Sequence, residues 1–166
     1  MEPAVKIRVL GVEDWADWRA MRLRALAEAP DAFGSTLAGW TGANDLEERW
    51  RQRLAEVEFN VLADLEDSPV GMVSAAVSAP AEVELLSMWV APEARGRGIG
   101  DALVQAVMGW AAEAEAHRVV LGVRQANAHA IALYCRHGFD DLGPYGGPEG
   151  PWPPERCMAR SVAGRT

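Results

Sequence analysis

Residues 90–103 read VAPEARGRGIGDAL. In this stretch an apolar strand ends at Val90, a turn opens at Pro92, two arginines alternate with glycines, and a helix is expected to begin at about Ile99. Glycines let the backbone approach a ligand closely, and the unpaired amides of a helix's first turn point outward at the positive end of the helix dipole. The stretch therefore predicts a cradle for an anion such as a phosphate group.

The spacing of the glycines narrows the class of this loop. A Walker A loop is excluded because no Lys-Ser or Lys-Thr follows the second glycine, and a dinucleotide fingerprint is excluded because the glycines occupy every second position. The letters R-x-x-G-x-G at 95–100 instead resemble the signature (Q/R)-x-x-G-x-(G/A) of the GCN5-related N-acetyltransferase (GNAT) family. There the signature holds the pyrophosphate of acetyl-CoA, so the resemblance implies a coenzyme-binding set of Arg95, Gly96, Arg97, Gly98, Ile99 and Gly100. A Gly/Arg-rich surface turn is the alternative.

A second block downstream is similar to another part of the same family. It reads N-x-x-A-x-x-L-Y-x-x-x-G-F over residues 127–139. Asn127, Ala130 and Tyr134 lie at i, i+3 and i+7, so we expect them to share one face of a helix that Asn127 caps. The resemblance implies that all three lie at the coenzyme and that Tyr134 gives a proton to the departing thiolate. Two blocks in the expected order support the family far better than either block alone.

Composition limits the other classes of function. The 166 residues include 16 Lys or Arg against 24 Asp or Glu, a formal net charge of -8, which disfavours nonspecific binding to nucleic acid or to an anionic membrane. No signal peptide or membrane span is recognisable, so we expect a cytoplasmic protein. Cys135 and Cys157 form no metal-binding motif; we expect two buried thiols and no metal. Residues 1–166 are expected to form a single domain.

Periodicity predicts the order of the elements. Apolar residues alternate in the strands and recur at helical spacing in the helices. We expect strands at 5–10, 59–65, 70–77, 83–90, 119–123, 139–142 and 156–160, and helices from about 14 to 29, 44–56, 99–116 and 127–137. The predicted fold class is α/β (α+β): a GNAT-like mixed, largely antiparallel sheet of six to seven strands flanked by four helices.

The strand before the loop is expected to carry the reacting groups. In the family this strand splays from its neighbour at a bulge, which implies that the segment of Met88, Trp89 and Val90 holds the pantetheine arm and the acetyl carbonyl, with the Trp89 side chain on the other side of the sheet. Glu84 is the candidate general base because it shares an otherwise apolar strand face, where desolvation would raise its pKa. Glu82, a loop residue or ordered water are the alternatives, and Glu84 could also be an exposed carboxylate at the strand end.

The acceptor site is less defined by the sequence. Arg22 lies in the apolar stripe of the first predicted helix. Either its aliphatic stem lies along the edge of the core while its guanidinium reaches water, or the side chain contacts the substrate. Phe33 lies in the turn-rich segment 30–42, and it is a second candidate contact together with Glu84. The segment 143–154, with Tyr145 and Trp152, is either a flap over the site or a disordered connection.

These observations predict direct transfer of an acetyl group from acetyl-CoA to a primary amine in a ternary complex. Cys135 follows Tyr134 directly in the predicted helix, so its side chain should point away from the site that Tyr134 faces. This disfavours covalent catalysis by Cys135. A small-molecule amine is the first acceptor class, and a protein N-terminus or lysine is the second. A noncatalytic acyl-CoA sensor and an unrelated phosphate-binding module are the rivals from other classes. We expect a monomer or a homodimer.

Overall fold

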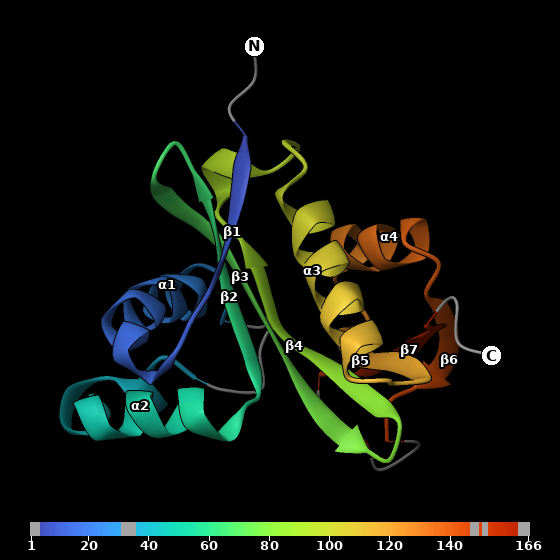
Figure 1. The fold of residues 1–166 in the computed structure, drawn as a ribbon, viewed down its shortest axis with the longest axis horizontal. Coiled ribbons are helices and arrows are strands. Elements are labelled where there is room, and N and C mark those ends of the chain that lie inside the picture. The colour runs from blue at the N-terminus through green and yellow to red at the C-terminus, as the bar shows by residue number, and fades with distance from the viewer. Residues whose placement is uncertain (1–3, 31–35, 147–149, 151–152, 163–166) are drawn as a thin grey trace.

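The computed structural model of the protein describes residues 4–30, 36–146, 150 and 153–162. Within these residues seven strands form one sheet in the order β1-β2-β3-β4-β5-β7-β6 (Figure 1). Their bounds are β1 Val5–Val9, β2 Phe59–Leu65, β3 Ser68–Ala79, β4 Glu82–Val90, β5 Arg118–Arg124, β6 Asp140–Pro144 and β7 Glu155–Ser161. All neighbouring strands are antiparallel except β4 and β5, which are parallel. The predicted mixed, largely antiparallel sheet is confirmed.

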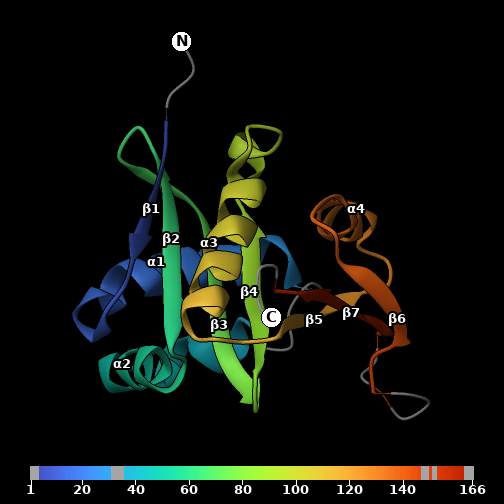
Figure 2. The same cartoon turned by 45° about the vertical axis from the view of Figure 1, so that its right-hand side comes forward.

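Four α-helices flank this sheet in the described part of the chain: α1 Trp15–Glu28, α2 Glu47–Glu56, α3 Ile99–Glu113 and α4 Ala128–Arg136. Figures 1 and 2 show α1 and α2 on one side of β1–β4 and α3 on the other, with α4 beside α3 over the strands that end the chain. The sheet thus separates two regions, one between α3 and α4 and one between α1 and α2.

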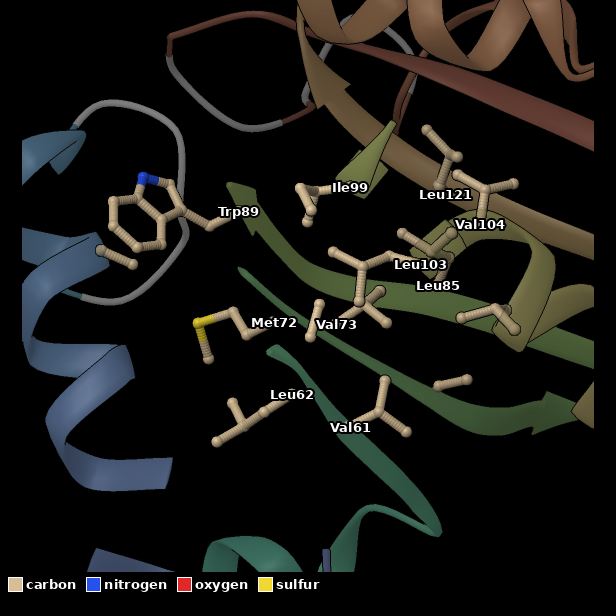
Figure 3. Close-up of a cluster of buried hydrophobic side chains, with 14 of the residues drawn as sticks. Val61, Leu62, Met72, Val73, Leu85, Trp89, Ile99, Leu103, Val104 and Leu121 are labelled. Atoms are coloured by element: carbon tan, nitrogen blue, oxygen red, sulfur yellow. The ribbon is translucent and has the colours of Figure 1, made fainter. Parts of the chain in front are cut away.

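The core has a layer on each face of the sheet, because consecutive strand residues point in opposite directions. In Figure 3 the layer toward α1 holds Leu62, Met72 and Trp89. The layer toward α3 includes Val61, Val73, Leu85, Leu103 and Val104. These side chains are at most 4% exposed. A sheet that is apolar on both faces fixes the position of β4, which runs between the two layers.

The sheet opens at β4. Strands β4 and β5 pair only over Glu82–Glu84 and Arg118–Val120, so residues 85–90 extend beyond that pairing. On its other edge β4 bulges against β3, since Met72 faces Trp89 whereas Ser74 faces Leu86. Ser87 lies in this bulge with a left-handed φ of 56°. The splay and bulge that the family resemblance implied are both present.

Two local expectations differ from the structure. Helix α2 begins at Glu47 and not at residue 44, after a 3-10 turn at Gly42–Asn44, and the side chain of Asp45 does not cap it. Asp45 instead accepts a hydrogen bond from Trp50 Nε1 at 2.8 Å and pairs with Arg19, so it ties α2 to α1. The thiols were expected to be buried, but Cys135 is exposed and Cys157 is partly exposed. Cys135 lies on the solvent-facing side of α4, where a small side chain can stay exposed.

Candidate functional site

A cleft of about 780 Å³ opens at the carboxyl end of β4. Its walls are the end of β4, the loop 95–98, the first turn of α3, one face of α4, and the end of α1. Ten residues predicted to bind the coenzyme line it: Met88, Trp89, Val90, Arg95, Gly96, Gly98, Ile99, Gly100, Asn127 and Ala130. The two sequence blocks therefore meet at one cavity, although about 30 residues separate them in the chain.

The loop backbone has the conformation of an anion cradle. Gly96 and Gly98 have left-handed φ values of 78° and 81°, which L-residues with a side chain rarely adopt. A Cβ at either glycine would meet no atom within 4 Å, so the space above the loop is open. The first intrahelical hydrogen bond runs from the Ala102 amide to the Gly98 carbonyl, so the amides of residues 99–101 precede the helix ladder. They can donate to an anion at the positive end of α3.

Gly100 has a different role from Gly98. Its φ lies outside the left-handed region, but a Cβ there would stand 3.0 Å from Leu133 Cδ2 on α4. The missing side chain lets the first turn of α3 approach α4 closely. Asp101, in the same turn, accepts hydrogen bonds from Arg136 at the end of α4 and from the next residue, His137, at 2.8 and 2.6 Å. These contacts fix the two helices that form opposite walls of the cleft.

Arg95 is held by groups at the mouth of the cleft. Its Nε donates to the Val90 carbonyl at 3.1 Å, and its Nη2 pairs with Glu28 at 3.1 Å. Glu28 also accepts from Trp89 Nε1 at 2.8 Å, and the pKa of Glu28 is lowered by this bond and by Arg95. The Trp89 side chain thus faces α1, as expected, while its residue still lines the cleft. Arg97 is exposed and does not line the cleft.

Helix α4 presents one face to the cleft, and Tyr134 lies outside that face. Asn127 caps α4 by accepting from the Ala130 amide at 3.2 Å, as predicted, and both residues line the cavity together with Leu133. Tyr134 is 4% exposed, its ring centroid lies 5.7 Å from that of Phe139, and it does not line the cavity. In this arrangement Tyr134 packs against Phe139, and its place at the coenzyme stays a prediction. Burial raises the pKa of Tyr134, which keeps its phenol protonated.

A model of the acetyltransferase (GNAT) family matches residues 16–139. The chain belongs to this family. An N-acetyltransferase from Streptomyces griseus is 40% identical over 72 residues, or 43% of this chain and 36% of that protein. A phosphinothricin N-acetyltransferase from Streptomyces coelicolor is 37% identical over 59 residues, or 36% of this chain and 34% of that protein. The chain thus matches about a third of the length of these two curated relatives.

Solved structures share the fold over nearly the whole chain. A ribosomal-protein-alanine N-acetyltransferase from Brucella melitensis has 27% identity and a TM-score of 0.72, with 95% of this chain and 99% of that one covered. A putative acetyltransferase from Salmonella typhimurium, solved with its cofactor acetyl-CoA, has 20% identity and a TM-score of 0.74, with 96% and 94% covered. The second likeness, at this identity, shows the GNAT fold alone.

Within the GNAT fold, Glu84 stands where β4 leaves β5. Its pKa is raised by burial and by the negative charges of Glu82 and Glu155. Glu82, the alternative base, pairs with Arg118 at 2.7 Å, and this contact lowers its pKa. A raised pKa makes a carboxylate a better proton acceptor, so the electrostatics favour Glu84 over Glu82. Glu84 does not line the coenzyme cleft.

Tyr145 adds a second phenol beside Glu84. Its pKa is raised first by the negative charge of Glu84, and its backbone amide donates to the Glu155 carbonyl at 2.8 Å. The segment predicted as a flap or a disordered connection is thus ordered at Tyr145 and packs near the candidate base. Trp152, from the same segment, lies outside the described residues.

Of the residues predicted to contact the acceptor, Arg22 lies on α1. Arg22 is only 8% exposed, so the expectation that its guanidinium reaches water is wrong. It lies close enough to Arg53 of α2 for that second positive charge to lower its pKa. Phe33 lies outside the described residues.

Sequence reasoning missed several polar groups of both regions. At the coenzyme cleft these are Glu28, Asp101, His129 and Arg136. At the acceptor side they are Arg53, Asn60, Ser74 and Ser87. The acidic first turn of α3 could have indicated Asp101, but no local pattern joins Arg53 to partners on other elements. Among the described residues, no group of three or more His, Cys, Asp or Glu is placed to hold a metal, and no helix is long and apolar enough to cross a membrane.

Proposed function

We propose that the protein is an acetyl-CoA-dependent N-acetyltransferase, formed by residues 1–166 as one domain, that acts on a primary amine of a small molecule. The observation that carries this proposal is the pair of left-handed glycines, Gly96 and Gly98, whose open side faces a cleft beside the free amides of α3. A volume of about 780 Å³ lies in the range of ordinary small-molecule and cofactor sites. A cytoplasmic location and a monomeric or dimeric state stay predictions.

The residues of this chain suggest a division of roles. The amides of residues 99–101, with Arg95, hold the pyrophosphate, and Asn127 and Ala130 line the far wall of the coenzyme site. Backbone groups of Met88 and Val90, on the part of β4 that β5 leaves uncovered, orient the thioester carbonyl.

Transfer needs three proton movements. Glu84 takes one proton from the ammonium form of the acceptor, and the neutral nitrogen then attacks the thioester carbon. As the tetrahedral intermediate collapses, the C–S bond breaks and the nitrogen loses its second proton to water. Tyr134 gives its proton to the departing thiolate, and its raised pKa keeps that proton available at neutral pH. Because Tyr134 does not line the cleft, this role requires α4 to present it when the coenzyme arm is bound. No covalent intermediate on the protein is needed.

The relatives differ in the class of acceptor that they favour for this protein. The phosphinothricin N-acetyltransferase favours a small molecule, and the ribosomal-protein-alanine N-acetyltransferase, which matches nearly the whole chain, favours a protein N-terminus as the second candidate. Both acceptors offer a primary amine, so the coenzyme site does not distinguish them. The difference must lie on the α1/α2 side.

Release of free thiol from acetyl-CoA tests the function. Purified protein is incubated with acetyl-CoA and, separately, with phosphinothricin, single amino acids, simple alkylamines, and a peptide that begins with alanine. Release that depends on a small amine is expected. Release with the peptide alone would make the protein N-terminus the acceptor, and tight acetyl-CoA binding without release for any amine would identify a noncatalytic sensor.

A further inference from the structure

One side chain of α2 reaches across the sheet to the bulge of β4. Arg53 is partly buried, and its Nη2 donates to Ser74 Oγ of β3 at 3.2 Å and to Ser87 Oγ of β4 at 3.4 Å. Its Nη1 donates to Asn60 Oδ1 of β2 at 2.9 Å. One guanidinium thus joins three neighbouring strands to α2, and its rigid planar fork sets the direction of each hydrogen bond.

Ser87 differs from the other two oxygens in its backbone. Where β4 bulges, Ser87 and Met88 stand opposite the single residue Val73 of β3. Ser87 has a left-handed φ of 56° there, a conformation that is unfavourable for an L-residue unless its surroundings maintain it. The next residue, Met88, lines the coenzyme cleft. The hydrogen bond from Arg53 therefore acts on a strained residue that lies directly beside the wall of the cleft.

The other contacts of Arg53 hold its guanidinium in place. Ser74 Oγ donates to Asn60 Oδ1 at 2.7 Å, and Asn60 Nδ2 donates at 2.9 Å to the carbonyl of Val57, the residue that follows α2. The guanidinium carbon lies 5.0 Å from the ring centroid of Trp18 on α1, within cation–π range. Burial lowers the pKa of Arg53 to about 10, so the group stays charged at neutral pH. A charged donor that is held on several sides is a rigid anchor for an oxygen of β4.

We propose that Arg53 is a positioning residue for acetyl transfer: through Ser87 it holds the bulge of β4 in the shape that lets the backbone of Met88 orient the thioester carbonyl. This inference rests on the acetyl transfer proposed above, and it gives α2 a task that neither sequence motif contains. Loss of Arg53 frees Ser87 to leave the left-handed region. The backbone of Met88 then turns away from the acetyl group, while the loop at residues 95–101 keeps its shape.

Paired variants of the whole protein test the connection through Ser87. Arg53→Met removes the donors, while Ser74 and Asn60 stay hydrogen-bonded to each other. We expect kcat/KM for the amine to fall by about tenfold or more, because a small displacement of a reacting group is costly, and the KM for acetyl-CoA to change by less than about twofold. In the Ser87→Gly background, Arg53→Met should lower kcat/KM by less than about twofold, because glycine keeps a left-handed φ without help.

Matched variants separate this effect from loss of fold. Arg51→Met removes the same charge from the same helix, but the Arg51 side chain is 41% exposed and pairs with Glu47 on the surface, so it should leave both kinetic constants unchanged. If Arg53→Met fails to fold, Ser87→Ala and Ser87→Gly decide. Both lose the hydroxyl, but only alanine is strained in the left-handed region, so Ser87→Ala should be slower than Ser87→Gly by about fivefold or more.

Hydrogen exchange gives a readout that needs neither coenzyme nor amine. If Arg53 holds the bulge, the backbone amides of residues 85–91 should exchange about tenfold faster in Arg53→Met than in the wild-type protein, because local opening becomes easier. Arg51→Met should leave their exchange unchanged. Peptide-resolved mass spectrometry of the free protein would measure both.

The outcomes distinguish this inference from the proposed function. An equal loss from Arg53→Met with Ser87 and with Ser87→Gly, or unchanged exchange at residues 85–91, would overturn the positioning role while leaving the acetyltransferase proposal intact. A KM for acetyl-CoA that rises as much as kcat/KM for the amine falls would also overturn it, because the effect would then lie in coenzyme binding. Absence of thiol release with every amine and peptide would refute the acetyl transfer and, with it, the step that Arg53 serves.

Discussion

The coenzyme region and the acceptor region of this protein are built in different ways. The coenzyme region uses backbone amides and left-handed glycines that lie within a short stretch, residues 95–101, together with one face of α4. The proposed acceptor region uses side chains that come from α2 and three strands. A ligand that is bound through the backbone leaves a local signature in the sequence. A ligand that is bound by converging side chains leaves none.

The two regions also differ in charge pairing. At the coenzyme cleft Arg95 pairs with Glu28, and Asp101 pairs with Arg136. At the acceptor side Arg53 contacts neutral oxygens. Variants of the first region should therefore change the KM for acetyl-CoA, and variants of the second should change the KM for the amine. The variants below test that separation from the largest expected effect to the smallest.

Glu84→Gln should have the largest effect. A general base contributes about 100-fold to 10,000-fold, so turnover at neutral pH should fall by about 100-fold or more, with little change in the KM for acetyl-CoA. Steady-state kinetics with both substrates varied would check this. Glu82→Gln is the matched control, because its carboxylate pairs with Arg118 instead. An equal loss in both variants would mean that neither is the base.

The pH dependence of Glu84 gives a second measurement. Its pKa lies above the ordinary value of 4.5, and the base must be deprotonated, so kcat/KM should fall as the pH drops through this raised pKa. Glu84→Gln should remove that limb. Since folding raises the pKa, the stability that Glu84 contributes is present at low pH and is lost as the pH rises through the folded-state pKa. The glutamine variant should therefore unfold at a higher temperature than wild type at pH 8.

Tyr134→Phe is expected to lower turnover by about 100-fold if Tyr134 is the acid, with the KM for acetyl-CoA nearly unchanged. Tyr145→Phe is the control, because Tyr145 is the other phenol near the reacting strand and its pKa is also raised. Single-turnover measurements would isolate the chemical step. A larger loss in Tyr145→Phe than in Tyr134→Phe would move the acid to Tyr145, and it would leave Tyr134 as a packing partner of Phe139.

Gly98→Val should raise the KM for acetyl-CoA by roughly tenfold. A left-handed conformation costs an L-residue about 1–2 kcal/mol, and a β-branched one more, so the loop will shift and move its amides away from the phosphate. Gly109→Ala is the control within α3, where a Cβ has open space and helix propensity predicts a gain of about 1 kcal/mol. A KM that is unchanged in Gly98→Val would refute the cradle.

Glu28→Gln should have a smaller effect of the opposite sign. The carboxylate holds Arg95 at 3.1 Å and competes with a bound phosphate, whereas glutamine can still accept from Trp89 Nε1. Partly exposed pairs of this kind are weak, so the KM for acetyl-CoA should fall by about two- to fivefold. Glu93→Gln, which removes an exposed partner of Arg24 instead, should change it little. A higher KM in Glu28→Gln would mean that Glu28 orients Arg95 for binding.

The contrast between a site built from one short stretch and a site built from distant side chains also explains which features the sequence could predict. The strands along the chain and the four helices followed from periodicity, whereas the splay at β4 and ten cleft residues followed from the family resemblance of two local motifs. The buried state of Arg22 did not, because the sequence places it in an apolar stripe without showing Arg53 opposite. The packing of Tyr134 against Phe139 was not visible either, because the spacing of residues on α4 does not show how that helix contacts its neighbours.

Gly100→Ala should have the smallest effect, and it tests whether the two motif glycines differ as the structure indicates. Its added Cβ would meet the flexible end of Leu133 at 3.0 Å, and that side chain can move because it borders the open cleft. The gain of about 1 kcal/mol in helix propensity offsets the crowding, so the melting temperature should change by only a few degrees and the KM for acetyl-CoA by less than about threefold. The double variant Gly100→Ala with Leu133→Val should recover any loss, because the shorter side chain leaves room for the Cβ. A loss in Gly100→Ala as large as that of Gly98→Val, without recovery in the double variant, would mean that the coenzyme itself approaches Gly100.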